Sequence, residues 1–164
     1  IGFYFSTGWK KVDNWQNRFR GTTYNTMDPK GRIAIPARFR ELIDASGAQV
    51  VLTGVDGAIY AFTPDQWAVV EAKVLAMGET TREMRRFRRA LIGMATICSC
   101  DRQNRLLIPH MLRQYAGLEK DVVQVGQLKH FEIWAKDRYE TDQGQLEADI
   151  DSPVLGPLID KLAL

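Results

Sequence analysis

The stretch that decides the fold is Asp28-Pro29-Lys30-Gly31-Arg32-Ile33-Ala34-Ile35-Pro36. Aspartate, proline and glycine at its first, second and fourth positions predict a β-turn over residues 28–31. The residues from Arg32 to Ile35 leave this turn as a short strand. Pro36 then begins a helix over residues 37–43, because proline is tolerated at the first helical position.

The same pattern recurs later in the chain, where the turn reads Asp101-Arg102-Gln103-Asn104-Arg105. Other similar residues are separated by the same number of positions as the two turns, to within one residue. These pairs are Ile35-Pro36 with Ile108-Pro109, Arg40 with Arg113, Gly54 with Gly126, and Phe62 with Trp134. Motifs repeated at a fixed offset indicate an internal duplication. Each half is predicted as strand, turn, strand, helix, strand, turn, strand and helix.

The remaining elements follow from local patterns of polar and apolar residues. Strands are predicted over residues 22–27, 49–53 and 58–62. One helix begins after Thr63 and ends at Gly78, and a second begins with a capping box of Thr80 and Glu83. In the second helix Met84, Phe87 and Leu91 share a face and are expected to pack inward. Residues 149–157 are expected to be a linker and 158–164 a tail helix.

Each half has about 70 residues, which is too few to bury a comfortable core alone. We therefore expect the strands of the two halves to interleave around one shared core. The predicted fold class is α+β and β-rich, with two pseudo-twofold-related units and flanking helices.

The amino-acid composition limits the classes of function that we expect for this protein. The chain has 164 residues, a net charge of +2, 45% hydrophobic residues and two cysteines, Cys98 and Cys100. Zinc usually needs four ligands, and only His110 and His130 could join the cysteines, so we expect no metal and no cofactor.

The sequence contains none of the common catalytic motifs, so we expect that the protein is not an enzyme and has no small-molecule substrate. No apolar run reaches the ~18 residues that span a bilayer, and no secretory pattern opens the sequence, so we expect no membrane partner and a cytoplasmic location.

Two residue types in each turn are predicted to be structural. Asp28 and Asp101 can accept hydrogen bonds from backbone N–H groups two residues further on. Gly31 and Asn104 both tolerate the left-handed backbone that a turn exit needs. These four residues are therefore the candidates for shaping the two turns.

The cations of the two turns are the candidate DNA-binding residues: Arg32, Arg105, Lys30 and Arg102. The planar fork of arginine suits a phosphate or the acceptor edge of guanine, and a two-stranded ribbon fits the major groove. The alternative is that these residues are ordinary solvated charges on surface turns. Repetition of the pattern in both halves strengthens the binding interpretation but leaves both interpretations open.

The sequence resembles the MraZ family at several positions. The resemblance is carried by Phe19-Arg20-Gly21 and the stretch 27–36 in the first half. The second half contributes Leu91-Ile92-Gly93, residues 101–109, Leu112 to Leu118, Val125-Gly126-Gln127 and Phe131 to Trp134. The resemblance extends from about Phe19 to Leu164.

This resemblance implies two tandem AbrB-like units of the double-split β-α-β, swapped-hairpin type. The implied units are residues 22–65 and 95–138, joined by connecting helices at 66–93 and followed by a C-terminal helix and tail at 139–164. It also implies a nucleoid-associated transcriptional repressor of the bacterial division and cell-wall gene cluster. Such proteins form ring-shaped homo-oligomers that bind direct repeats in their own promoter on double-stranded DNA. Arg32 is the residue that the family ties most closely to DNA binding, and Arg105 is its counterpart.

Three questions stay open at this point. The chain could instead be an oligomeric protein-interaction scaffold with structural turns, or an AbrB-like antitoxin. The arginine-rich segment 81–92 could be a second DNA surface, a solvated helix or part of an interface between copies. Residues 1–18 are interpreted as an extension, from a non-native segment or a start site placed too far upstream.

Overall fold

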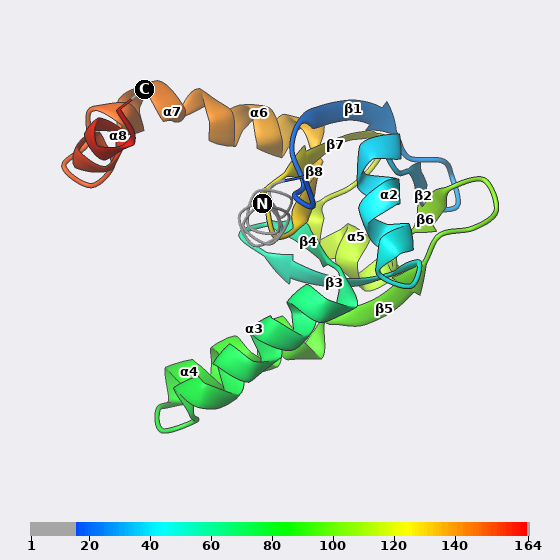
Figure 1. The fold of residues 1–164 in the computed structure, drawn as a ribbon, viewed down its shortest axis with the longest axis horizontal. Coiled ribbons are helices and arrows are strands. Elements are labelled where there is room, and N and C mark those ends of the chain that lie inside the picture. Colours follow the sequence, from blue (N-terminus) through cyan, green and yellow to red (C-terminus); the bar gives the residue numbers. More distant parts are fainter. Residues whose placement is uncertain (1–15, 164) are drawn as a thin grey trace, which may run out of the picture.

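A six-stranded antiparallel sheet forms the centre of the computed structural model, which describes residues 16–163 (Figure 1). The prediction about residues 1–18 lies almost entirely outside this range. The sheet order is β1 (Thr22–Thr26), β7 (Asp121–Gly126), β8 (Phe131–Ala135), β4 (Ala58–Phe62), β3 (Gln49–Val55) and β5 (Thr96–Ser99). A separate two-stranded ribbon pairs β2 (Arg32–Ala34) with β6 (Arg105–Leu107).

The order of the sheet shows how the two halves combine. The first strand of each half pairs with the other half, β1 with β7 and β5 with β3. The central pair, β4 and β8, also joins the halves. The order is therefore the same from either edge once β1 is equated with β5, β3 with β7, and β4 with β8. The strands interleave, and the fold is the α+β arrangement predicted from the sequence.

The hydrophobic core draws on both halves. Phe19 and Phe39 from the first half pack against Phe131 from the second, with ring centroids 5.0 to 5.3 Å apart. Ile33 and Leu106 on the two ribbon strands are fully buried in the same cluster. Neither half closes this core alone, which is why two units too small for a core of their own form a single sheet.

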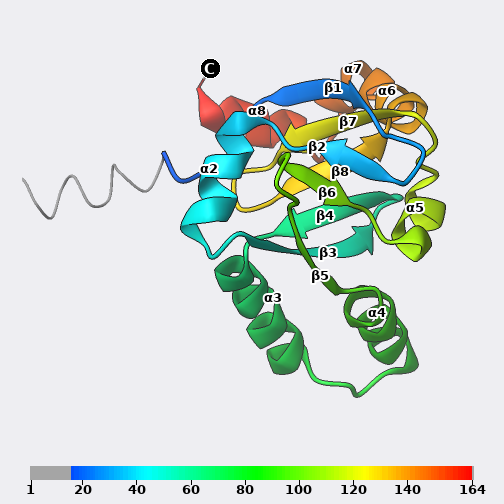
Figure 2. The same ribbon diagram turned by 90° about the vertical axis from the view of Figure 1, so that its right-hand side faces the viewer.

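The helices flank the sheet or extend from it (Figures 1 and 2). Their bounds are α2 (Ala37–Ala45), α3 (Pro64–Met77), α4 (Arg82–Gly93), α5 (His110–Ala116), α6 (Lys136–Gly144), α7 (Leu146–Ile150) and α8 (Gly156–Leu162). The predicted linker at 149–157 is too long, since α7 reaches Ile150 and α8 begins at Gly156. Within residues 16–163, no helix combines the length and the apolar character needed to cross a membrane.

The helix caps follow the sequence at α3 and depart from it at α4. Thr63 caps α3, and Gly78, with φ of +75°, ends it. Thr81 rather than Thr80 caps α4, accepting a hydrogen bond from the Met84 backbone N–H at 3.1 Å. The capping box predicted at Thr80 is wrong, because the helix begins one residue later. The residue three positions after the true cap is Met84, so Glu83 lies in the first turn without completing a box. The inward face is also wrong at one position, since Phe87 is 51% exposed while Leu91 is buried.

The cap of α4 gives a direct test. Thr81→Ala should lower the free energy of unfolding by about 1 kcal/mol, because it leaves an orphaned N–H at the helix start. Thr80→Ala is the matched control and should change stability by less than about 0.5 kcal/mol. Urea denaturation followed by circular dichroism measures both. Equal losses in the two variants would contradict the assignment of Thr81 as the cap.

Candidate nucleic-acid interface

The first turn is held together by the carboxylate of Asp28. Its Oδ1 accepts hydrogen bonds from the backbone N–H groups of Lys30 and Arg32, both at 2.9 Å. Its Oδ2 lies 2.6 Å from the Nε of Arg32. The Arg32 N–H and, with it, the guanidinium hold the pKa of Asp28 below its usual range, although partial desolvation opposes them. Asp28 therefore shapes the turn and orients Arg32 at the same time.

The second turn repeats this arrangement. Asp101 Oδ1 accepts hydrogen bonds from the backbone N–H groups of Gln103 at 2.8 Å and Arg105 at 3.0 Å. Asp101 Oδ2 lies 3.0 Å from the Nε of Arg105. The backbone N–H of Arg105 lowers the pKa of Asp101 in the same way. Two turns with different sequences thus orient an arginine by the same contacts.

The backbone conformation at the exit of the first turn also matches that at the exit of the second turn. Gly31 and Asn104 have φ of +89° and +61°, the left-handed region that these residue types tolerate. A side chain at Gly31 would also collide with the guanidinium of Arg113, which comes from the other half. Arg40, its counterpart in the first half, lies close enough to Asp101 for that carboxylate to help raise the arginine's pKa, after the larger effect of Asp44. Gly31 thus lies against an arginine of the opposite half, a contact that the matched pair Arg40 and Arg113 alone did not reveal.

The two oriented arginines lie on one face of the β2–β6 ribbon. The register places Arg32 opposite Leu107 and Ala34 opposite Arg105. Side chains alternate along a strand, so these four residues share the outer face while Ile33 and Leu106 are buried on the inner face. We call Arg32, Ala34, Arg105 and Leu107 the ribbon face. Arg32 and Arg105 are diagonal neighbours on it, and Arg105 Nη1 lies 3.7 Å from Asp28 Oδ2 across the ribbon.

Lys30 and Arg102 lie at the exposed tips of the two turns. All four predicted cations therefore come from one ribbon and its two turns (Figure 2). The side chains of Arg32 and Arg105 are 28% and 29% exposed, and each uses its Nε for the aspartate. The outward ends of their guanidinium groups can donate two parallel hydrogen bonds to a phosphate or to a guanine edge.

One polar cluster escaped the sequence analysis. Glu132 on β8 is buried and accepts a hydrogen bond from the Trp134 indole at 2.7 Å. His130 Nε2 lies 3.4 Å from its Oε1, and the His130 ring stacks on Tyr60 with centroids 4.5 Å apart. Burial would raise the pKa of Glu132, but contacts with His130, Trp134 and Tyr60 outweigh it and lower the pKa. The cluster compensates a carboxylate placed in the sheet. Its only sequence signal was the spacing of His130, Glu132 and Trp134 at every second residue, which places them on one face.

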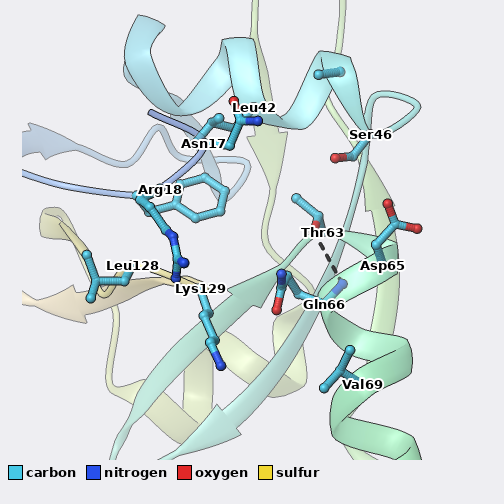
Figure 3. A pocket seen from close by; sticks show the side chains of 12 residues that line it. Asn17, Arg18, Leu42, Ser46, Thr63, Asp65, Gln66, Val69, Leu128 and Lys129 are labelled. Carbon is cyan, nitrogen blue, oxygen red and sulfur yellow. Dashed lines mark hydrogen bonds between the residues drawn. The ribbon is translucent and has the colours of Figure 1, made fainter. Parts of the chain in front are cut away.

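Figure 3 shows a hollow beside the start of α3. Arg18 and Lys129 line one side of it, and Thr63, Asp65 and Gln66 line another. The dashed line is the long cap contact of 3.5 Å from the Gln66 backbone N–H to Thr63 Oγ1. The N-terminal turn of α3 forms only part of its polar wall, and none of the ribbon-face residues lines it.

The cysteines are free thiols on and next to β5. Cys98 and Cys100 are both partly buried, and burial raises the pKa of each thiol. Within the described residues, no group of three or more histidine, cysteine, aspartate or glutamate side chains is arranged to hold a metal.

Comparisons with known proteins agree with this duplicated arrangement. The family model described as "MraZ protein, putative antitoxin-like" matches the chain twice, over residues 18–90 and 91–153. The transcriptional regulator MraZ of Desulfosudis oleivorans is 46% identical over 146 residues, covering 89% of this chain and 99% of that protein. The protein of the same name from Desulforapulum autotrophicum is 43% identical over 147 residues, with the same two coverages. The protein of this name from Shewanella denitrificans is 36% identical over 82% of this chain and 90% of its own length.

The two matches meet between residues 90 and 91, so each contains one of the aspartate–arginine turns. The similarity to the relatives therefore spans both turns and the interleaved sheet rather than a single motif. On the strength of both matches and these relatives, the chain belongs to the MraZ family.

Proposed function

We propose that this protein is a sequence-specific DNA-binding regulator of transcription and that the ribbon face reads the DNA. The observation that carries the proposal is the pair Arg32 and Arg105, each oriented by its own aspartate on one exposed face. The relatives named as transcriptional regulators support the same function. The two turns belong to units that we place at residues 22–65 and 95–138.

The ribbon face suits the major groove, which is about 12 Å wide and admits a two-stranded β-ribbon. Arg32 and Arg105 would donate paired hydrogen bonds to base edges, since Asp28 and Asp101 have already fixed their direction. Ala34 and Leu107, which lie between them, offer apolar contacts of the kind that thymine methyl groups make. Lys30 and Arg102 at the turn tips are placed to contact the phosphates on either side.

We also propose that the protein acts as a ring-shaped homo-oligomer on direct repeats in its own promoter. It would repress the division and cell-wall gene cluster, as the family resemblance implies, and would be found in the cytoplasm on the nucleoid.

One ribbon face offers few phosphate contacts, so binding of DNA by a single copy should be weak and salt-sensitive. Several copies held at a fixed spacing would raise the overall affinity without new contacts. Repeats about 10 bp apart would present the same groove to successive copies.

Fluorescence anisotropy with the DNA directly upstream of the coding sequence tests this function. The wild-type protein should bind it in preference to a scrambled duplex of the same length. Raising the salt from 50 to 200 mM should weaken binding by about tenfold or more, because the cations release counterions from phosphates. Equal affinity for the two duplexes would reject sequence-specific binding and favour the scaffold alternative.

A further inference from the structure

Two helical arms leave the sheet at equivalent points of the duplication. The basic arm consists of α3 and α4, residues 64–93, and follows β4. The acidic arm consists of α6 to α8, residues 136–162, and follows β8. Both arms extend to the left in Figure 1, away from the ribbon at the right. The fold therefore presents two related arms on the side opposite the proposed DNA-reading face.

The basic arm carries a stripe of arginines that have no partner among the residues the structure describes. Arg82, Arg86 and Arg89 recur at helical spacing on α4 and are exposed. The ion pairs and hydrogen bonds within residues 16–163 include none of these three side chains. In contrast, Arg88 pairs with Glu79, and Arg85 donates to the Glu79 backbone carbonyl at 2.8 Å. The stripe is thus available to carboxylates of another molecule.

Apolar side chains are exposed on the same arm. Leu75 and Met77 at the end of α3 are 65% and 53% exposed, and Phe87 on α4 is 51% exposed. A phosphate backbone would cover none of these residues. Their presence beside the arginines indicates a protein partner with both apolar and acidic groups.

The acidic arm has the complementary character. Its outer part carries the exposed carboxylates Glu147, Asp149, Asp151 and Asp160. Its exposed apolar side chains are Leu146, Ile150, Val154, Leu158 and Leu162. The helices α7 and α8 have only five and seven residues, which is too short for stability in isolation. Since α8 packs chiefly on α7, much of the surface of both helices is open to another molecule.

We propose that the basic arm of one copy binds the acidic arm of the next copy, head to tail. This inference rests on the self-assembly proposed above and names the surfaces that make it. Like arms repel each other and unlike arms attract, so the contact is heterologous although the two arms are equivalent in the fold. A heterologous contact repeated with a suitable rotation closes into a ring. The arms extend away from the ribbon, so this contact leaves every ribbon face free.

A charge exchange tests the contact. The basic-arm variant carries Arg86→Glu and Arg89→Glu, and the acidic-arm variant carries Glu147→Lys and Asp151→Lys. Each alone places like charges opposite each other, so the apparent dissociation constant of the oligomer should rise by about tenfold or more. In an equal mixture the two variants can alternate, which restores attraction at every contact, so large oligomers should form again. One chain with all four substitutions should assemble as well, because its arms have exchanged charges.

The controls distinguish an effect on the contact between arms from an effect on folding or on DNA binding. Glu41→Lys with Glu119→Lys reverses two exposed carboxylates outside both arms and should leave the oligomer unchanged. Circular dichroism of every variant should match that of the wild type. All sedimentation runs are made without DNA, so the outcome does not depend on operator recognition.

Each other outcome has a distinct meaning. Wild-type oligomers in both single-arm variants, or no recovery on mixing, would overturn the arm-to-arm contact while leaving self-assembly intact. An unchanged oligomer with weaker binding to scrambled DNA in the basic-arm variant would instead make α4 a DNA surface. A monomeric wild type would overturn both the contact and the proposed assembly.

Discussion

Replacing Arg32 by alanine should weaken binding to the upstream DNA by about ten- to a hundredfold. A well-placed bidentate arginine contributes about 1–3 kcal/mol of discrimination between bases. The Arg32 side chain is aimed outward by Asp28, whose Oδ2 lies 2.6 Å from its Nε. The substitution removes a half-buried side chain at the surface of the ribbon and leaves the buried Ile33 in place. Asp28 keeps its hydrogen bonds from the backbone N–H groups of residues 30 and 32, so the fold and the oligomer should persist. Arg105→Ala should have an effect of the same kind, because the second turn repeats the geometry.

Arg102→Ala provides the matched control for a charge on the same ribbon. Arg102 is exposed at the turn tip, and within residues 16–163 no aspartate pairs with it to direct it at a base. Its loss should weaken binding to upstream and scrambled DNA alike and reduce the slope of log affinity against log salt by about one. Anisotropy titrations at several salt concentrations, with sedimentation to confirm the oligomer, measure all three variants. If Arg32→Ala lowered the affinity for both duplexes equally, Arg32 would be a phosphate contact and not a reader of bases.

Gly126→Ala should lower the free energy of unfolding by about 3 kcal/mol. An added methyl group at Gly126 would occupy the same space as the backbone of Phe19 and Arg20. The backbone there cannot move freely, because the Gly126 N–H donates to the Gly21 carbonyl and Phe19 pairs with Leu128. Relief of the clash would displace Phe19, which is 3% exposed and packs on Phe39 and Phe131. Loss of a buried phenylalanine costs about 3–5 kcal/mol, and overpacking costs about 1–3 kcal/mol.

Gly54→Ala is the control supplied by the duplication itself. Gly54 is the counterpart of Gly126, but its added methyl group would meet the side chains of Tyr115 and Met94. Side chains can shift more easily than paired backbone, so the loss should be about 1–2 kcal/mol. Urea denaturation curves of both variants give the comparison. A larger loss for Gly54→Ala would show that the Phe19 segment adjusts without leaving the core.

The comparison of these two glycines illustrates what a repeat in the sequence can and cannot predict. The repeat identified Gly54 and Gly126 as equivalent, and in the chain they are equivalent in sheet position. Their surroundings differ because residues 19–21 cross Gly126, whereas a helix side chain covers Gly54. Equivalence in sequence therefore predicts topology but does not predict which neighbour lies close.

Local features of this protein could be predicted from its amino-acid sequence. The turns at Asp28 and Asp101, the left-handed exits at Gly31 and Asn104 and the cap at Thr63 depend on hydrogen bonds between residues at most four positions apart. Such contacts need no distant partner, so composition and spacing are enough to predict them. The duplication and the family resemblance came from the same short stretches.

The tertiary structure alone decided how these features meet. It pairs β2 with β6, joins Asp28 to Arg105 across the ribbon and places Arg113 against Gly31 of the other half. It also leaves Phe87 exposed on an arm where periodicity predicted burial. These contacts join residues far apart in sequence. They form only when the shared core of the two halves brings distant surfaces together, and local patterns of residues do not encode that packing.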